Sequence, residues 1–369
     1  MTTATSDTSG RMTRPVLVWL ICVAALVAMM VVVGGATRLT DSGLSITEWQ
    51  PIMGAIPPLS DVDWQIAFDK YKQIPEYIQV NAGMSMAEFK VIYWWEWAHR
   101  FLGRVVGLVF FVPFVFFLVC GMIPRRALLP LIGLFCLGGF QGFLGWYMVQ
   151  SGLSGRVDVS QYRLAAHLGL AIVIYCALIW YVLRERVPSF DPARNGTLSL
   201  HMLPRGFAIS AVVIVGLVFL QILSGAFVAG MRAGLAHNTW PLMDGAFIPD
   251  GLFIMAPAWA NLFENALTVQ FNHRMLAYVL TAVVVVHVVT LLRQPSLGAR
   301  RSGTVLGIAI LGQMTLGIAT LLAMVPVWLG VMHQGGSLVV LTAALVHADA
   351  VLRCVPQRQP ALEGRPALA

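Results

Sequence analysis

The sequence predicts an all-α integral membrane protein with eight transmembrane helices, arranged as two parallel-repeated four-helix bundles. Three observations carry this prediction. Hydrophobic residues make up 58% of the 369 residues and charged residues only 11%, whereas about a quarter of a soluble domain is charged. Eight apolar runs are long enough to cross a bilayer as helices. The second half of the chain also repeats motifs of the first half in the same order, which indicates two related halves.

The apolar runs define the expected elements and their orientation. Arginines gather at alternate ends of the runs, which is the positive-inside pattern, so the formal charge of +7 indicates membrane orientation and not a nucleic-acid partner. Both termini are then expected to be cytoplasmic. The runs lie near residues 16–36, 99–122, 127–149, 163–183, 206–229, 270–292, 303–324 and 328–352.

This pattern predicts a division into five parts. A cytoplasmic tail over 1–15 precedes a first four-helix half over 16–184, which includes an external loop over 37–98. A cytoplasmic linker over 185–205 leads to a second four-helix half over 206–352, and a cytoplasmic tail over 353–369 follows. None of the five cysteines forms an obvious pair in an external loop, so we expect no structural disulfide.

The repeat is visible in motifs that recur at similar offsets. Trp49 and Trp240 belong to matching loop segments that lie 191 residues apart. The His99-Arg100 pair recurs as His273-Arg274, and Gln141 recurs as Gln313. Because each half has an even number of spans, the two halves are expected to have parallel and not inverted orientation.

The first external loop is expected to contain structure of its own. Residues 61–73 can form a short amphipathic helix with Trp64, Phe68 and Tyr71 on one side. Ser85 and Glu88 have the spacing of a capping box, so a helix that starts there would continue into the second span. This segment is placed to act as a lid over the first pair of histidines.

Four histidines are the main functional signal. His99, His167, His273 and His333 each lie in the outer part of an apolar run, one pair in each half. A histidine in a membrane span is costly and usually functional, and two facing imidazoles are what a six-coordinate haem iron needs. A lone histidine would more often be interfacial or hydrogen-bonded, and zinc would require four protein ligands. Four histidines in repeated register favour haem.

Charged neighbours of these histidines are candidates for binding the haem edge. Arg100 and Arg104 flank His99, Arg163 precedes His167 by one helical turn, and Arg274 follows His273. Guanidinium groups are natural partners of haem propionates. The alternative for each arginine is a positive charge at the lipid interface.

Glu96 distinguishes the two halves. It precedes His99 by three residues and so shares its helix face, whereas the second half has Gln270 at the corresponding place. This asymmetry predicts chemistry in the first half and a supporting role for the second. The alternative is an interfacial glutamate that pairs with an arginine, and Glu48 is a weaker candidate for the same role.

A further pair of histidines leaves another hypothesis open. His287 and His347 follow His273 and His333 by 14 residues, which is close to four helical turns. They could therefore form a second bis-histidine site at the cytoplasmic end of the second half.

Several motifs together resemble one family, the haem A synthases of bacteria and mitochondria. The resemblance extends over roughly residues 16–352. The motifs that carry it are Gly43-Leu-Ser-Ile-Thr-Glu-Trp-Gln-Pro51, the stretch from Glu88 to Arg104, Asn238-Thr-Trp-Pro-Leu-Met-Asp-Gly245, Phe271-Asn-His-Arg274 and His333-Gln-Gly-Gly-Ser337.

The resemblance implies a reaction and a cofactor. It implies oxidation of the C8 methyl group of haem O to the formyl group of haem A, through an alcohol. His99 and His167 would hold the substrate haem, His273 and His333 would ligate haem B, and Glu96 would act near the reacting methyl group. It also implies a multi-pass protein of the bacterial inner membrane. The cysteine pair that some members carry in an external loop is absent here.

The resemblance also implies partners, and it leaves rivals open. The partners are haem O, the farnesyl-transferring haem O synthase, cytochrome oxidase assembly proteins and membrane lipid. One rival is a dihaem b-type cytochrome that passes electrons from quinol, and another is a haem carrier or assembly scaffold. The electron donor, the source of the oxygen atom, association into homo-oligomers and the release of an axial histidine during turnover all stay open.

Overall fold

The computed structural model describes residues 12–186 and 202–355. The expected tails and the linker between the halves therefore lie largely outside the described residues, over 1–11, 187–201 and 356–369. Within the described part, eight helices are long and apolar enough to cross a membrane, and no β-strand occurs. The predicted all-α membrane class and the predicted number of spans are confirmed.

The eight long helices match the apolar runs closely, with α4 starting well before its apolar run. Each half of the chain contributes four of them. They are α1 (Arg14–Leu39), α4 (Met86–Val119), α5 (Arg125–Gln150) and α6 (Gln161–Arg186), followed by α7 (Arg205–Gly230), α9 (Ala266–Leu291), α10 (Leu297–Leu322) and α11 (Val327–Leu352).

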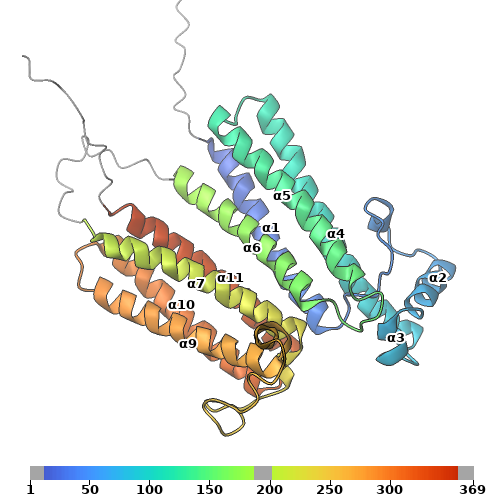
Figure 1. Ribbon diagram of the computed structural model, residues 1–369. Coiled ribbons are helices and arrows are strands. Elements are labelled where there is room, and N and C mark those ends of the chain that lie inside the picture. The colour runs from blue at the N-terminus through green and yellow to red at the C-terminus, as the bar shows by residue number, and fades with distance from the viewer. Residues whose placement is uncertain (1–11, 187–201, 356–369) are drawn as a thin grey trace, which may run out of the picture.

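Each half packs its four helices into a closed ring (Figure 1). In the first half α1 packs on α4, α4 on α5, α5 on α6, and α6 on α1. In the second half the same order runs through α7, α9, α10 and α11. Helices α4 and α6 therefore face each other across the first ring, and α9 and α11 face each other across the second. The two rings meet where α1 and α6 pack against α7 and α11.

Small residues and hydrogen bonds hold the two rings together. The Gln334 side chain donates to the carbonyl of Val31 over 2.9 Å, in a space that a side chain at Gly35 would occupy. The hydroxyls of Tyr175 and Thr342 lie 2.7 Å apart at the same interface. Since a polar group in an apolar interior is costly without a partner, these bonds favour one register between the halves.

An ion cluster joins the two halves at one end of the molecule. Arg38 lies 3.1 Å from both Asp41 and Asp158. Arg232, at the end of α7, contacts the same two carboxylates over 2.8 and 3.0 Å. Because two arginines share two aspartates, the cluster links the ends of α1 and α7 with the loop before α6.

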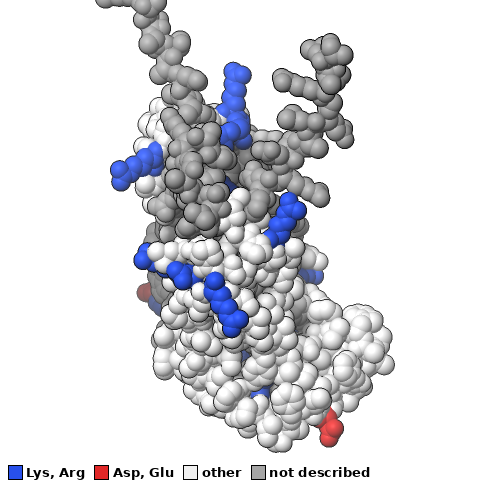
Figure 2. All heavy atoms as spheres, turned by 90° about the vertical axis from the view of Figure 1, so that its left-hand side faces the viewer, with Lys and Arg blue, Asp and Glu red and all other residues white. Residues whose placement is uncertain are grey.

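The described chain ends gather at the opposite end (Figure 1). There the backbone N–H of Met12 donates to Glu185, and Arg353 donates to the carbonyl of Leu183. Figure 2 shows arginine and lysine side chains over the upper and middle parts of that view and few over its lower part.

The external loop forms a small aromatic layer on the extension of α4. Helix α2 (Asp61–Tyr71) buries Trp64, Phe68 and Tyr71, as its periodicity predicts. The Phe68 and Phe89 rings stack with centroids 4.8 Å apart, and Trp64 meets Tyr93 edge-on at 4.9 Å. The capping box of Ser85 and Glu88 is present and α4 continues unbroken into the span, so both predictions are confirmed. Helix α3 (Pro75–Gln79) was not expected.

A buried glutamate lies beneath this layer. Glu76 on α3 is 4% exposed and accepts a 3.4 Å hydrogen bond from the Tyr71 hydroxyl. Burial raises the pKa of Glu76 to about 8, and the nearby carboxylates of Asp41 and Glu96 act in the same direction. Glu76 is therefore protonated, and neutral, in the folded loop at neutral pH.

The raised pKa predicts a pH-dependent loop. The pKa of Glu76 in the folded loop lies above the ordinary glutamate value of 4.5, so the stabilisation is complete below about pH 4.5 and is lost as pH rises toward 8. Hydrogen–deuterium exchange of α2 and α3, corrected for intrinsic rates, should show increased opening between about pH 6 and about pH 9. Glu76→Gln should remove this dependence, while Asp69→Asn, at an exposed carboxylate of α2, should keep it. A Glu76→Gln profile identical to that of the unsubstituted chain would contradict the assignment.

Candidate functional site

The four outer histidines lie on helices that face each other across a ring. His99 lies on α4 and His167 on α6, the two helices that face each other across the first ring. His273 on α9 and His333 on α11 hold the same places in the second ring. The structure therefore places the two pairs that the sequence singled out on facing helices, one pair in each four-helix ring.

Each histidine imidazole lies against a glycine of a neighbouring helix in the same four-helix ring. A Cβ atom at any of these glycines would come within 3.3 Å of the imidazole, which is closer than carbon atoms ordinarily pack. The imidazole thus occupies the space that a side chain would fill. The pairs are Gly34 on α1 with His99, Gly145 on α5 with His167, Gly225 on α7 with His273, and Gly317 on α10 with His333.

Three of the four histidines are also held by a glutamine. In each case the side-chain amide group lies 3.1–3.2 Å from the ring Nδ1 and donates to the backbone carbonyl of the same histidine. The sequence repeat had singled out two of these glutamines without a role, and it missed the third. The pairs are Gln141 with His167, Gln221 with His273 and Gln313 with His333.

The donor set fits a haem with two imidazole ligands. A metal-bound histidine usually donates its other ring N–H to an acceptor. The amide oxygens of Gln141 and Gln221 are buried beside their histidines and have no partner, and an amide oxygen and nitrogen exchange places when the group turns over. The described residues contain no group of three or more histidine, cysteine or acidic side chains that could hold a metal ion. A four-ligand zinc site is therefore not supported.

The arginines expected at the haem edge bind loop carbonyls. Arg100 donates to the carbonyls of Ile46 and Glu48 over 2.7 and 2.9 Å. Arg274 in the second half donates to the carbonyls of His237 and Thr239 over 2.7 and 2.8 Å. These acceptors occupy matching positions in the two loops, so each half uses an arginine one residue after its histidine to fix the same loop segment.

The other two arginines behave similarly. Arg104 donates to the carbonyls of Gln50 and Pro51 over 2.9 and 2.8 Å. Arg163 donates to the carbonyl of Tyr147 over 2.6 Å and stacks on the Tyr147 ring. Donor capacity is still left over, because Arg104 Nη1 and Arg274 Nε are buried without a partner. An anionic group that reached these atoms could bind to them.

Glu96 holds a loop to α4. Its side chain is almost fully buried and accepts from the Ser45 hydroxyl and the Ile46 N–H, both over 2.7 Å. The other carboxylate oxygen accepts from Arg100 over 2.6 Å. We call residues 45–48, which Glu96 and Arg100 hold together, the strap. It is anchored on the turn of α4 that precedes His99.

The corresponding Gln270 holds the second loop by donating. Its amide donates to the carbonyls of Ala233 and His237 over 2.9 and 3.2 Å. The difference between Glu96 and Gln270 therefore follows the hydrogen-bonding groups of the two loops, because one loop offers donors and the other acceptors. The Glu48 carboxylate lies outside, half exposed, where it pairs with Lys70 over 2.6 Å.

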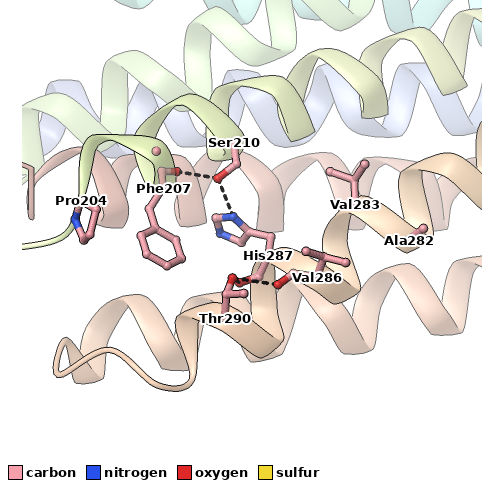
Figure 3. A pocket seen from close by; sticks show the side chains of 9 residues that line it. Pro204, Phe207, Ser210, Ala282, Val283, Val286, His287 and Thr290 are labelled. Atoms are coloured by element: carbon pink, nitrogen blue, oxygen red, sulfur yellow. Dashed lines mark hydrogen bonds between the residues drawn. The ribbon is translucent and has the colours of Figure 1, made fainter.

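The two inner histidines bind each other. The Nε2 atoms of His287 and His347 lie 2.8 Å apart. Ser210 binds the outer nitrogen of His287 over 2.7 Å (Figure 3), and Ser302 binds that of His347 over 2.9 Å. An iron between two imidazoles would need nitrogens about 4 Å apart, since metal–nitrogen bonds are about 2 Å long. The direct hydrogen bond therefore favours a structural histidine pair over a further haem at this place.

This chain of four polar side chains instead ties together all four helices of the second ring. A groove of about 550 Å³ lies beside it between α7 and α9, lined mainly by apolar side chains that include Phe207, Val283 and Val286 (Figure 3). Replacing one histidine would leave its buried partner unsatisfied, at a cost of about 1–3 kcal/mol.

We predict that His347→Leu lowers the thermal stability of the purified protein and leaves its haem content unchanged. The double variant with His287→Leu should recover part of the stability, because no unpaired imidazole then stays buried. Haem extraction and thermal melting measure the two effects. Loss of one haem per chain in His347→Leu would restore the haem hypothesis for this pair.

Fold and site together define a polytopic helical membrane protein with a bis-histidine pair inside each of two four-helix rings. The chain matches the family described as cytochrome oxidase assembly protein over residues 17–345. With nearly the whole membrane region covered, the chain belongs to this family.

Curated relatives are similar over almost their full length. The chain is 56% identical over 329 residues to a protein of Parvibaculum lavamentivorans named "Heme A synthase", covering 89% of this chain and 92% of the relative. It is 51% identical over 351 residues to a protein of the same name from Azorhizobium caulinodans, covering 95% and 97%. A third, from Nitrosospira multiformis, is 50% identical over 341 residues, covering 92% and 94%.

Proposed function

We propose that this protein is a haem A synthase, an oxidoreductase that converts the C8 methyl group of haem O to a formyl group. The observation that carries the proposal is the pair of bis-histidine sites in two rings that differ at Glu96 and Gln270. The names of the relatives, which cover nearly the whole chain, support the same activity. The protein is a multi-pass protein of the bacterial inner membrane.

The two halves have different tasks in this proposal. The first half takes haem O between His99 and His167, and the second half keeps haem B between His273 and His333. Both second-half histidines are fixed by glutamines, which suits a permanent cofactor. Bound haem supplies the redox chemistry, and the side chains of the chain hold and orient it.

The residues around the substrate site position it and limit access to it. Glu96 and Arg100 hold the strap against α4, and Arg104 Nη1, a buried donor without a partner, is a candidate to bind a propionate. Since Arg100 already neutralises the Glu96 carboxylate, we assign Glu96 to positioning of the strap and not to direct contact with the methyl group. Arg163 binds the carbonyl of Tyr147, and Arg274 binds the carbonyl of Thr239 in the loop of the second half.

The repeat and the orientation are part of the proposal. The matching order of helices in the two rings and the matching carbonyls bound by Arg100 and Arg274 support a parallel duplication. Arginines at the end that carries the chain termini support a cytoplasmic position for that end. Haem O synthase and cytochrome oxidase assembly proteins are the partners that the proposal implies.

Catalysis can be distinguished from electron transfer or haem carriage by product analysis. The chain is expressed with a source of haem O, and its haems are extracted and separated. Haem A or the alcohol intermediate establishes the oxidation. Unchanged haem O in a protein with both haems bound favours a dihaem cytochrome or a carrier.

We predict that the two sites separate by mutation. His273→Ala or His333→Ala should remove most of the tightly bound haem B, because one axial ligand is lost. His99→Ala or His167→Ala should abolish the product while haem B is retained. Haem extraction with product analysis measures both effects. Equal loss of haem B from both sets would show that the halves are assigned wrongly.

Glu96→Gln should lower haem A formation by about a hundredfold, a loss typical of a disturbed catalytic constellation. The amide nitrogen cannot accept from the strap or from Arg100, so the strap loosens, while haem B keeps its spectrum. The matched control is Gln270→Glu, which should leave haem O binding intact. Glu96→Asp should recover part of the rate because it restores the acceptor. Near-normal output from Glu96→Gln would remove Glu96 from the reaction.

A further inference from the structure

His99 is the only one of the four outer histidines that no glutamine holds in the described structure. Gln221 lies four residues before Gly225, the glycine that faces His273. At the matching place on α1, four residues before Gly34, the chain has Met30. The Met30 methyl group would lie 3.3 Å from a Cβ atom at Gly103, so it packs on α4 one turn after His99.

The His99 ring also has a different orientation from the other three. Its Nε2 atom is the atom nearest to the facing glycine, at 2.9 Å from a Cβ built at Gly34. In His167, His273 and His333 the nearest ring atom is Cε1. No hydrogen bond to the His99 ring occurs among the described residues. An imidazole without a polar partner can turn more easily than one in a histidine whose Nδ1 and backbone carbonyl are both bound by a glutamine.

We infer that Met30 makes His99 the exchangeable axial ligand of the substrate haem, while His167 is the fixed one. The inference rests on the proposed function. A partner at Nδ1 fixes the ring of a metal-bound histidine and strengthens it as a ligand, and a thioether is only a weak acceptor with no donor. Met30 is therefore a positioning residue that acts through His99.

This difference between the halves suits their different tasks. A substrate haem must enter and a product haem must leave, so one weaker ligand in the first half favours exchange. The second half, with Gln221 and Gln313 in place, retains its haem. If the side chain at position 30 only filled space, it could carry the same hydrogen-bonding groups as Gln221 at the matching place in the second half.

The test exchanges the two residues between the halves. Met30→Gln introduces the side chain found in the second half, and Met30→Leu is the apolar control. Gln221→Met is the reciprocal change. The protein is purified with haem O in the first half and haem B in the second. Cyanide binding and haem O dissociation are then followed by absorption and electron paramagnetic resonance spectra, which do not depend on turnover.

We expect Met30→Gln to slow cyanide binding at the first-half haem and haem O dissociation by about tenfold or more, within the range for changes beside a metal ligand. Met30→Leu should behave as the unsubstituted chain, and Gln221→Met should make haem B react with cyanide about tenfold faster. Equal rates for Met30→Gln and Met30→Leu would overturn the inference.

Failure of the inference differs from failure of the proposed function. Haem extraction before the kinetic measurement shows whether haem O occupies the first half and whether His167→Ala removes it. If haem O never binds there, the proposed function fails. If it binds and Met30→Gln changes neither rate, only the role of Met30 fails. An unchanged haem B spectrum in Met30→Gln shows that the variant is folded.

Discussion

An imidazole inside a ring of apolar helices needs space and a polar partner, and the rest of the structure depends on how these are provided. The space comes from four glycines, one on the helix beside each histidine. The partner of three of the four comes from Gln141, Gln221 and Gln313, which bond to the imidazole and to the backbone of the same residue. The His99 ring has no such partner among the described residues. Since an unsatisfied polar group in lipid costs several kcal/mol, these contacts decide which way the histidines point.

The external loops depend on the same helix turns. Arg100 and Arg274 directly follow histidines and bind carbonyls of the loops that leave α1 and α7. A histidine that faces the ring and an arginine that faces the loop thus share one turn of helix. The position of the strap, which Glu96 and Arg100 hold, is therefore coupled to the position of His99. Arg232 then links the first and second halves through Asp41 and Asp158.

Hydrophobic pattern and spacing predicted the elements well. The eight spans, the buried face of α2 and the start of α4 at Ser85 all follow from periodicity and capping. These features are local, so the sequence contains all the information needed. The spacing of 14 residues also placed His287 and His347 on comparable turns, but it could not give the 2.8 Å that separates their nitrogens.

The contacts between helices could not be predicted in the same way. Periodicity identifies a face of a helix but not its neighbour, so Gly34 and Gln221 had no visible link to their histidines. The Glu96–Gln270 difference was visible, yet its physical cause lies in hydrogen-bond partners some 50 residues away along the chain, such as Ile46. The sequence selected the histidines, their neighbouring arginines and Glu96 as candidates, and the fold showed what each of them touches.

We propose that each ring holds one haem between its two facing histidines. Near-infrared magnetic circular dichroism of the purified chain, loaded with haem O, reports the axial ligands of every haem directly. We predict two haems per chain, both with two imidazole ligands, and loss of one of these signals in His167→Ala. A single bis-imidazole haem that persists in His167→Ala and disappears in His333→Ala, with no second haem at any haem O concentration, would contradict it.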